Sequence, residues 1–101
     1  MKHKLFRKIV GTKLHACCVF NLDTASSRTV CWKNTNELLG SNFYGIKTGI
    51  TKNAGPCLCA FYSKNCQQVI VVVLGASSKE QRWVDVPKLA EWGVQQFKSW
   101  V

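Results

Sequence analysis

Apolar residues along the chain fall into short runs separated by turn-forming residues, and the spacing within each run predicts its secondary structure. In the first third of the sequence, the pattern predicts the end of a helix at residues 4–10. Residues 15–20 and 29–32 are predicted strands. The segment between them, residues 21–27, is rich in turn formers, which indicates a β-hairpin.

The middle of the chain is predicted to form further strands. Residues 34–39 are expected to form one helical turn capped by Asn34 and ended by Gly40-Ser41-Asn42. Three strands are predicted after it, at about residues 44–51, 57–62 and 68–74. The connections between these strands contain Gly, Pro or Asn, as tight antiparallel turns require.

The last part of the chain has the spacing of an amphipathic helix. Apolar residues recur on one helical face between Lys79 and Trp100: Val86, Leu89, Ala90, Gly93, Val94 and Phe97. Ser78 is a candidate N-cap, and Pro87 is a candidate for the true start of the helix, because a residue before proline favours extended backbone. The predicted fold class is therefore α+β, an antiparallel sheet with a C-terminal helix packed on one face.

The run from Val69 to Leu74 is unusual for such a sheet. It is apolar at every position and mostly β-branched, as expected of a central strand that is buried on both sides. It is nevertheless the last predicted strand. Either an earlier strand of this chain pairs with it or another segment must, because an unpaired apolar edge promotes aggregation.

Charge and composition narrow the classes of partner. The net charge of +9 favours anionic partners, namely nucleic acid, acidic protein, a membrane surface or a cell-wall polymer. A basic surface without a function is the alternative. The longest apolar run is too short to span a bilayer, and Lys or Arg interrupts every apolar stretch in residues 1–13. The sequence therefore predicts no transmembrane segment and no secretory signal.

The six cysteines are Cys17, Cys18, Cys31, Cys57, Cys59 and Cys66. Their number is compatible with disulfides, but Cys57 and Cys59 alternate on one predicted strand and so share a face. No C-x-x-C pair occurs, and both histidines lie far from the later cysteines, so we expect no metal and no cofactor. We predict reduced, partly buried thiols and favour a reducing intracellular compartment over secretion.

Lys47-Thr48-Gly49 lies on a predicted strand, and the residues on both sides of this tripeptide make it informative about the family. Upstream is Trp32-Lys33-Asn34-Thr35-Asn36-Glu37-Leu38-Leu39-Gly40, and downstream are Ala54-Gly55-Pro56-Cys57-Leu58 and the apolar run at residues 69–76. Residues 6–13 and 82–97 extend the match at both ends. In this order, the motifs resemble the C-terminal part of the serine-type D-alanyl-D-alanine carboxypeptidases, which are penicillin-binding proteins. The resemblance implies a partial β-lactamase/transpeptidase-like fold, with residues 1–101 as the C-terminal segment of one catalytic domain.

The resemblance also implies roles for the residues of one active-site wall. Lys47 would supply positive charge near the nucleophile and the substrate carboxylate, and Thr48 would hydrogen-bond that carboxylate. Gly49 would let the substrate backbone approach and add to the strand. The backbone N–H of Ile50 would be one of two oxyanion donors. Arg82 is a further candidate for contacting an anion near this strand, with a solvent-facing arginine at the helix start as the alternative.

In that family, a Ser-x-x-Lys motif supplies the nucleophile, and a Ser-x-Asn motif before the Lys-Thr-Gly strand positions the substrate. No serine in this chain is followed by lysine three positions later. The single Ser-x-Asn, Ser63-Lys64-Asn65, follows Lys47 and falls in a predicted turn. The sequence therefore predicts a chain that is not catalytic alone, because the wall has no nucleophile to serve.

Four hypotheses about function follow from the sequence. The chain is a fragment or degenerate member of the carboxypeptidase family, or a non-catalytic subunit of an assembly whose partner covers Val69–Leu74. The third is half of a split enzyme, which would bind a D-Ala-D-Ala peptide or a β-lactam only when another chain supplies the serine motifs. The weakest is nucleic-acid binding, because basic residues accompany four aromatic ones but no motif of that class is present. Those aromatic residues are Trp32, Phe43, Tyr44 and Trp83.

Overall fold

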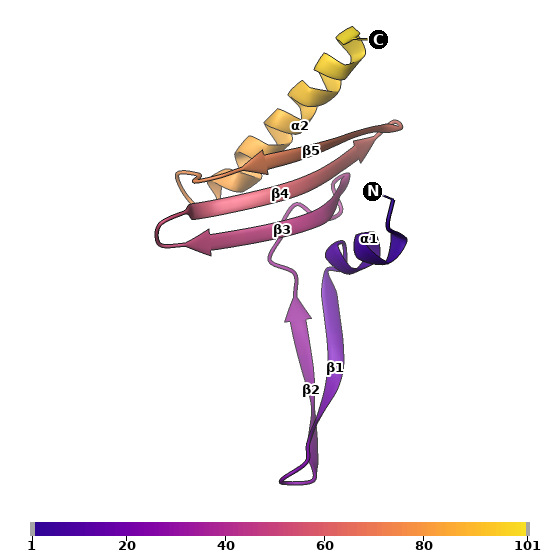
Figure 1. The fold of residues 1–101 in the computed structure, drawn as a ribbon, viewed down its shortest axis with the longest axis vertical. Helices are drawn as coiled ribbons and strands as arrows, with labels where there is room; N and C mark the ends of the chain where they lie inside the picture. Colours follow the sequence, from indigo (N-terminus) through magenta and orange to yellow (C-terminus); the bar gives the residue numbers. More distant parts are fainter. Residues whose placement is uncertain (1, 101) are drawn as a thin grey trace.

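Residues 2–100 fold into two separate antiparallel sheets and two helices (Figure 1). A computed structural model describes residues 2–100 and the side chains of residues 2–97; Met1 and Val101, the ends of the predicted domain, lie outside the described residues. The elements are α1 (Lys4–Val10), β1 (Leu14–Asn21), β2 (Ser26–Lys33), β3 (Phe43–Thr51), β4 (Gly55–Lys64), β5 (Gln67–Val73) and α2 (Gln81–Trp100). Apart from the predicted helical turn at residues 34–39, the predicted helices and strands, their order and the α+β class are confirmed.

Strands β1 and β2 form a hairpin that projects from the body of the molecule (Figure 1). With the hairpin included, the molecule measures 62 × 33 × 18 Å. The turn of the hairpin is fixed by the side chain of Asn21, whose Oδ1 accepts hydrogen bonds from the N–H groups of Asp23 (2.9 Å) and Thr24 (3.4 Å). Nearly every residue of both strands is exposed. The hairpin is therefore a second sheet outside the core, whereas the sequence pattern had predicted a single sheet.

The core lies between α2 and one face of the three-stranded sheet, whose strand order is β3-β4-β5. Alternate residues of β4 point at the helix and are buried: Leu58, Ala60 and Tyr62. The helix meets them with its own buried stripe of Val86, Ala90 and Val94. Each large side chain buried in this layer contributes about 1.5–3 kcal/mol, so α2 is held by the apolar face that its periodicity predicted.

Within the described residues, β5 is an edge strand, paired with β4 alone. Val71 faces α2 and is 8% exposed, whereas Ile70 and Val72 face away from α2 and are 61% and 57% exposed. The sequence predicted a central strand buried on both sides. An earlier strand of the chain covers only one edge of β5, and no described element covers the face that carries Ile70.

Two local predictions were wrong. Residues 34–38 form two successive side-chain turns in place of a helical turn, because Asn34 Oδ1 accepts the N–H of Asn36 (3.0 Å) and Asn36 Oδ1 accepts the N–H of Leu38 (3.0 Å). Pro87 does not begin α2 but lies inside it, since the helix already starts at Gln81. Ser78 does cap this helix, because its Oγ accepts the N–H of Gln81 at 3.1 Å.

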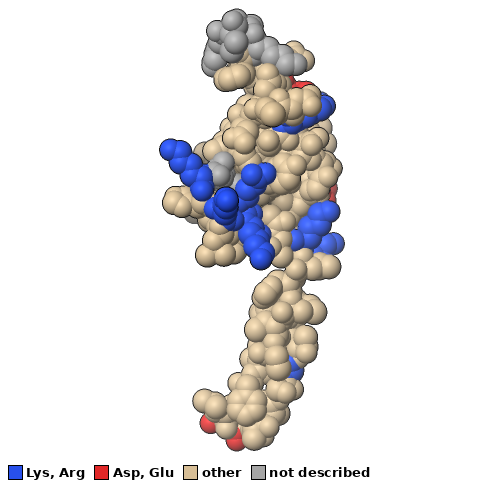
Figure 2. All heavy atoms as spheres, turned by 90° about the vertical axis from the view of Figure 1, so that its right-hand side faces the viewer, with Lys and Arg blue, Asp and Glu red and all other residues tan. Residues whose placement is uncertain are grey.

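Basic side chains gather on the body of the molecule, whereas the projecting hairpin carries few of them (Figure 2). Helix α1 contributes Lys4, Arg7 and Lys8 to this surface. Arg7 is also structural, because its guanidinium lies 4.9 Å from the ring centroid of Tyr44 and 5.7 Å from that of Phe61. On the face that Figure 2 shows, the positive charge therefore lies mainly on the body of the molecule and not on the hairpin.

A hydrogen bond from Tyr62 to Glu91 links β4 to α2 and makes stability depend on alkaline pH. Tyr62 Oη donates to Glu91 Oε1 at 2.7 Å, and this carboxylate, together with burial, raises the pKa of Tyr62 from 10.0 to about 12. Because the folded state holds the phenol proton more tightly, this contribution is complete below pH 10 and is lost as the pH rises from 10 to about 12.

We therefore expect Tyr62→Phe to lower the free energy of unfolding by about 1 kcal/mol at neutral pH and to flatten its decline between pH 10 and 12. Urea unfolding at a series of pH values measures both effects. Tyr44→Phe is the matched control, because Tyr44 is more exposed and lies on β3. An identical alkaline decline in Tyr62→Phe and the parent chain would contradict the assignment.

Candidate functional site

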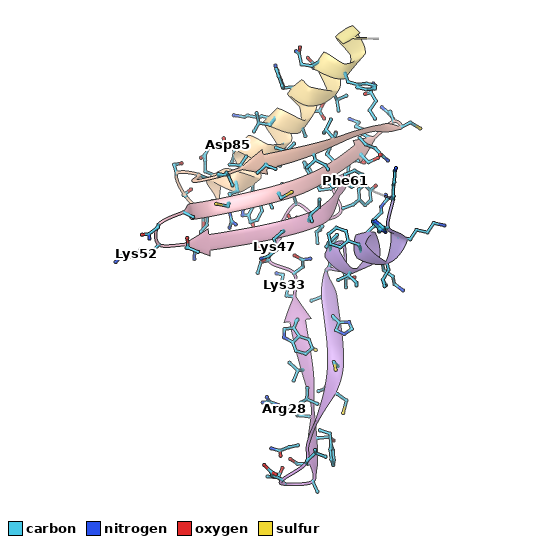
Figure 3. All side chains as sticks on the ribbon, in the orientation of Figure 1. Arg28, Lys33, Lys47, Lys52, Phe61 and Asp85 are labelled. Carbon is cyan, nitrogen blue, oxygen red and sulfur yellow. The ribbon has the colours of Figure 1, made fainter. Side chains whose placement is uncertain are left out.

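The segment Lys47–Ile50 lies on β3, at an edge of the three-stranded sheet. No other strand of residues 2–100 pairs with the outer side of β3. Figure 3 shows Lys47 on this strand and Lys33 at the end of the hairpin strand β2. The predicted wall residues are therefore brought together on an open strand, where an extended ligand can approach.

The register between β3 and β4 fixes which way each wall side chain points. Lys47 lies opposite Cys59 and Gly49 lies opposite Cys57, on the face of the sheet away from α2. Thr48 lies opposite Leu58, whose side chain is in the core beneath α2. The wall therefore presents the lysine on one face of the sheet and the threonine on the other, with the backbone edge between them.

Thr48 is positioned by a contact that the sequence did not predict. Its Oγ1 lies 2.5 Å from Oγ1 of Thr35, in the segment between β2 and β3. That segment is fixed by Asn34, whose Nδ2 donates to the carbonyls of Val10 (3.2 Å) and Thr12 (3.0 Å). The Asn-Thr-Asn triplet at residues 34–36, upstream of the Lys-Thr-Gly motif, is the only sequence signal for this contact.

Asn36 also holds the segment between β2 and β3 in place. It is buried, and its Nδ2 donates to the carbonyl of Gly45 on β3 at 3.2 Å. Because Asn34 holds the helix end and Asn36 holds β3, Thr35 between them is placed beside Thr48. The two amides thus act as positioning groups for the hydroxyl pair.

The backbone of Ile50 is oriented by its cross-strand partner, Pro56. Proline has no N–H, and the carbonyl of Pro56 accepts the N–H of Ala76 at 2.9 Å, on the β5 side of β4. The Ile50–Pro56 pair therefore cannot exchange the two hydrogen bonds of a hydrogen-bonded pair, so the Ile50 N–H points to the open edge. By the alternation of an antiparallel ladder, the backbone groups of Thr48 point to the same edge.

Gly49 faces open space. A Cβ atom built on Gly49 would meet no atom of the described chain within 4 Å. Packing within the chain therefore does not require glycine at this position. The vacant space above Gly49 is what close approach of a ligand backbone to the strand needs.

Arg82 is buried beneath the end of the wall and is only 4% exposed. Its Nη1 donates to the carbonyl of Cys57 at 3.1 Å, its Nε donates to that of Lys79 at 3.0 Å, and it stacks on Trp83 at 4.6 Å from the ring centroid. The alternative of a solvent-facing arginine is therefore wrong. Because Cys57 pairs with Gly49, Arg82 ties the first turn of α2 to the strand behind the wall.

The Ser63-Lys64-Asn65 motif is far from this wall. Ser63 lies near the end of β4, four positions beyond Cys59 and so about 13 Å along the strand from the partner of Lys47. Asn65 lies in the turn that follows, with φ of +52°. The motif therefore runs from the end of β4 into the hairpin turn, whereas the sequence predicted it within the turn.

The structure also bears on the predictions about the cysteines, metal ligands and membrane-spanning segments. All six cysteines have free thiols, and Cys57 and Cys59 share a face as predicted, but Cys17, Cys18, Cys31 and Cys66 are exposed, contrary to the expected partial burial. In residues 2–100, no group of three or more His, Cys, Asp or Glu side chains is arranged to hold a metal ion. Among the same residues, no helix is long and apolar enough to cross a bilayer.

The aromatic set proposed for stacking nucleic-acid bases is divided by the fold. Phe43 is in the core and is 3% exposed, and Trp83 packs against that core. Trp32 is exposed on the hairpin, where it stacks with His15, and Tyr44 is exposed on β3. These side chains do not form one platform, which removes the main support for that hypothesis.

The sequence of this chain is similar to those of known proteins of one family. The sequence model of the D-alanyl-D-alanine carboxypeptidase family matches residues 1–78. A D-alanyl-D-alanine carboxypeptidase of Streptomyces sp. (strain K15) is 36% identical over 96 residues, which are 92% of this chain and 33% of that protein. The D-alanyl-D-alanine carboxypeptidase DacF of Bacillus subtilis is 37% identical over 70 residues, covering 65% of this chain and 18% of its own length.

Solved structures give the same picture. The crystal structure of the Streptomyces K15 DD-transpeptidase superposes with a TM-score of 0.83 at 36% identity, over 92% of this chain and 36% of that one. Penicillin-binding protein D2 from Listeria monocytogenes, in its cefotaxime-bound form, superposes with a TM-score of 0.66 at 31% identity, over 88% and 33% of the two chains. The chain thus spans 33% of the length of the Streptomyces carboxypeptidase.

Proposed function

Because this chain belongs to the D-alanyl-D-alanine carboxypeptidase family, we propose that β3 is one wall of a site for the D-alanyl-D-alanine end of a peptide, or for a β-lactam. The chain supplies substrate-binding groups and an oxyanion donor, and it does not hydrolyse peptides alone. Its 101 residues contain no Ser-x-x-Lys motif and no Ser-x-Asn before Lys47, so a nucleophile has to come from elsewhere.

The open edge at Thr48–Ile50 is the observation that carries this proposal. The Ile50 N–H points outward, the space above Gly49 is empty, and no described strand pairs with this edge. An extended peptide would add to β3 through main-chain hydrogen bonds, which provide affinity without demanding particular side chains. An outward N–H at the reacting carbonyl would then stabilise the negative charge of a tetrahedral intermediate.

The charged groups around the edge suit an anionic ligand end. Lys47 is exposed, and its Nζ donates to the carbonyl of Thr48, so its charge lies along the edge. The Thr48 hydroxyl would donate to the ligand carboxylate, with Thr35 as its second partner. Arg82 would add positive potential from behind the strand, as a fixed charge near the same anion.

A split enzyme is the second candidate, and the exposed face and edge of β5 favour it. A polypeptide that carried Ser-x-x-Lys and Ser-x-Asn could pair with β5 and cover Ile70 and Val72. A non-catalytic subunit of a larger assembly would use the same partner surface without the serine motifs. The split-enzyme hypothesis and the subunit hypothesis both place a protein partner over Val69–Leu74.

Fluorescent penicillin tests the proposal, because it forms a covalent adduct only with an activated nucleophile. We expect no labelled chain when this protein is incubated alone. Labelling is expected after it is mixed with the region of a relative that carries Ser-x-x-Lys and Ser-x-Asn, and it should fall with Lys47→Met and Thr48→Val. Val84→Lys is the control, because Val84 is 45% exposed and lies on α2.

Two results would overturn this proposal. One is a penicillin adduct on the isolated chain, which would reveal a nucleophile within it. The other is a stable complex with the serine-bearing region in which Lys47→Met and Thr48→Val label as fast as the parent chain. The first would refute the absence of catalysis, and the second would refute the binding wall.

A further inference from the structure

Three basic side chains of α1 line one shallow hollow beside the sheet. Lys4, Arg7 and Lys8 share a cavity of about 320 Å³ with Gly11, which follows the helix, and Tyr44 of β3. The three basic residues are three and four positions apart, so they are neighbours on the helix surface. Figure 2 looks onto the side of the molecule that carries α1 in Figure 1 and shows basic side chains crowded on the body there. The hollow therefore concentrates positive charge within about one helical turn.

The local sequence does nothing to offset this charge. Residues 1–22 contain four lysines, one arginine and no Asp or Glu. Helix α1 has no acidic residue in its first turn, where the helix dipole favours one, and it places Lys4 there instead. Like charges three and four positions apart also destabilise a helix. A cluster that breaks these local rules without compensation nearby is typical of a functional site.

Arg7 is held in place for binding an anion. Its guanidinium lies 4.9 Å from the ring centroid of Tyr44 and 5.7 Å from that of Phe61. A guanidinium fixed by aromatic contacts loses little further conformational freedom when it binds a ligand. Its planar fork of N–H donors matches two oxygens of a phosphate group.

The compact arrangement favours a small phosphorylated ligand. A terminal phosphate offers three acceptor oxygens and a charge near −2, which suit three neighbouring cations better than a carboxylate does. A polymer backbone needs a track of basic groups, and the hairpin that leaves the body beside α1 carries few of them (Figure 2). Burial under another part of a protein is unfavourable for such a cluster, because cations without acidic partners are costly to remove from water.

We propose that the hollow between α1 and β3 binds a terminal phosphate or pyrophosphate group of a small ligand. Arg7 donates to two of its oxygens, and Lys4 and Lys8 donate to the others. This site is separate from the wall, because Tyr44 precedes Lys47 by three residues, about 10 Å along β3. The inference does not depend on the proposed function, since it requires neither a D-alanyl ligand nor a nucleophile.

Inorganic pyrophosphate is the probe, titrated into the purified full chain by calorimetry at fixed ionic strength. We expect saturable binding of one pyrophosphate per chain. Lys4→Met with Lys8→Met should raise the dissociation constant at least about 10-fold, because each change removes a charge-assisted hydrogen bond. The matched control is Lys52→Met with Lys88→Met, which removes the same charge from two exposed lysines and should stay within about two-fold. Lys52 follows the end of β3 that is far from α1 (Figure 3).

Two further variants separate binding from folding. Arg7→Met should weaken pyrophosphate binding by a similar factor, with Arg28→Met on the exposed hairpin strand β2 as its control. Lys4→Met alone should weaken binding and yet raise the urea concentration at which the free chain unfolds, because it relieves the repulsion within α1. A purely structural lysine would give the opposite result, lower stability with unchanged affinity, and that result would overturn the proposal.

Other outcomes would also overturn it. One is a parent chain with no saturable binding, and another is an equal loss of affinity in the α1 variants and their controls. Duplex DNA, polyglutamate and phosphatidylserine vesicles test extended occupants; if the α1 variants weaken binding of any of these more than binding of pyrophosphate, the small-ligand site is wrong. If Lys47→Met abolishes pyrophosphate binding and the α1 variants keep it, the probe occupies the wall, so this inference fails while the proposed function stands.

Discussion

Replacing Gly45 with alanine is expected to lower the free energy of unfolding by about 3 kcal/mol. Gly45 has φ of +149°, which side chains other than glycine rarely adopt, and a Cβ atom would lie 2.7 Å from Cγ2 of Val10. Val10 belongs to α1, which packs on β3 at this point. Relief of the clash would therefore push α1 away from the sheet.

Gly49→Ala is the matched control, since it makes the same chemical change four residues along the same strand. A Cβ on Gly49 meets no atom within 4 Å, so we expect a change within about 0.5 kcal/mol. Urea unfolding measures both differences, and hydrogen exchange should show faster opening of α1 only in Gly45→Ala. Equal destabilisation by the two changes would contradict the packing described for Gly45.

This pair of glycines shows what a sequence can and cannot predict. Both stand in the same apolar strand pattern, and only Gly49 belongs to a recognisable motif. The demand for glycine at position 45 comes from Val10, which is distant in sequence and reaches β3 only through the packing of α1. Local patterns carry no information about such a contact.

The predicted elements are confirmed where the spacing of apolar residues corresponds directly to the buried face. The α2 stripe of Val86, Ala90 and Val94 is buried as its spacing predicted. Pro87 was misjudged, because proline locally disfavours the preceding helical turn. The packing of Val86 on the sheet and the anchoring of Arg82 by Cys57 hold that turn in a helix regardless.

The separation of the hairpin from the main sheet could not be predicted either. Strand periodicity in β1 and β2 says that they pair, and they do, but it does not say which strand lies next to them. The segment between β2 and β3 decides this. Its Asn34 and Asn36 bond the end of α1 and β3, so the hairpin leaves the body at that point.

The candidate wall shows the same division. The Lys-Thr-Gly motif placed Lys47, Thr48, Gly49 and Ile50 together, and these residues are adjacent on one open strand. The role of Thr35 was missed, because it depends on a loop crossing beside Thr48 and no periodicity describes a loop. The wall is thus built largely within this chain, by the Thr35 contact in front and the Arg82 contact behind.

That arrangement gives a direct test of the proposed oxyanion donor. Ile50→Pro removes the backbone N–H that points to the open edge and also replaces the isoleucine side chain with a ring that fixes φ, whereas Ile50→Ala shortens the side chain but keeps the N–H. Proline is tolerated on an edge strand where the N–H faces solvent, and Ile50 is 47% exposed. Both variants are therefore expected to fold.

In the mixture with the serine-bearing region of a relative, Ile50→Pro should slow penicillin acylation by about 10²–10³-fold, the usual cost of losing one oxyanion donor. Ile50→Ala should react at close to the parent rate, because the donor is part of the backbone. Unfolding by urea of each chain alone checks that the two variants have similar stability. If the two variants acylate equally fast, the Ile50 N–H is not the donor, and β3 contributes binding groups to the site without stabilising the transition state.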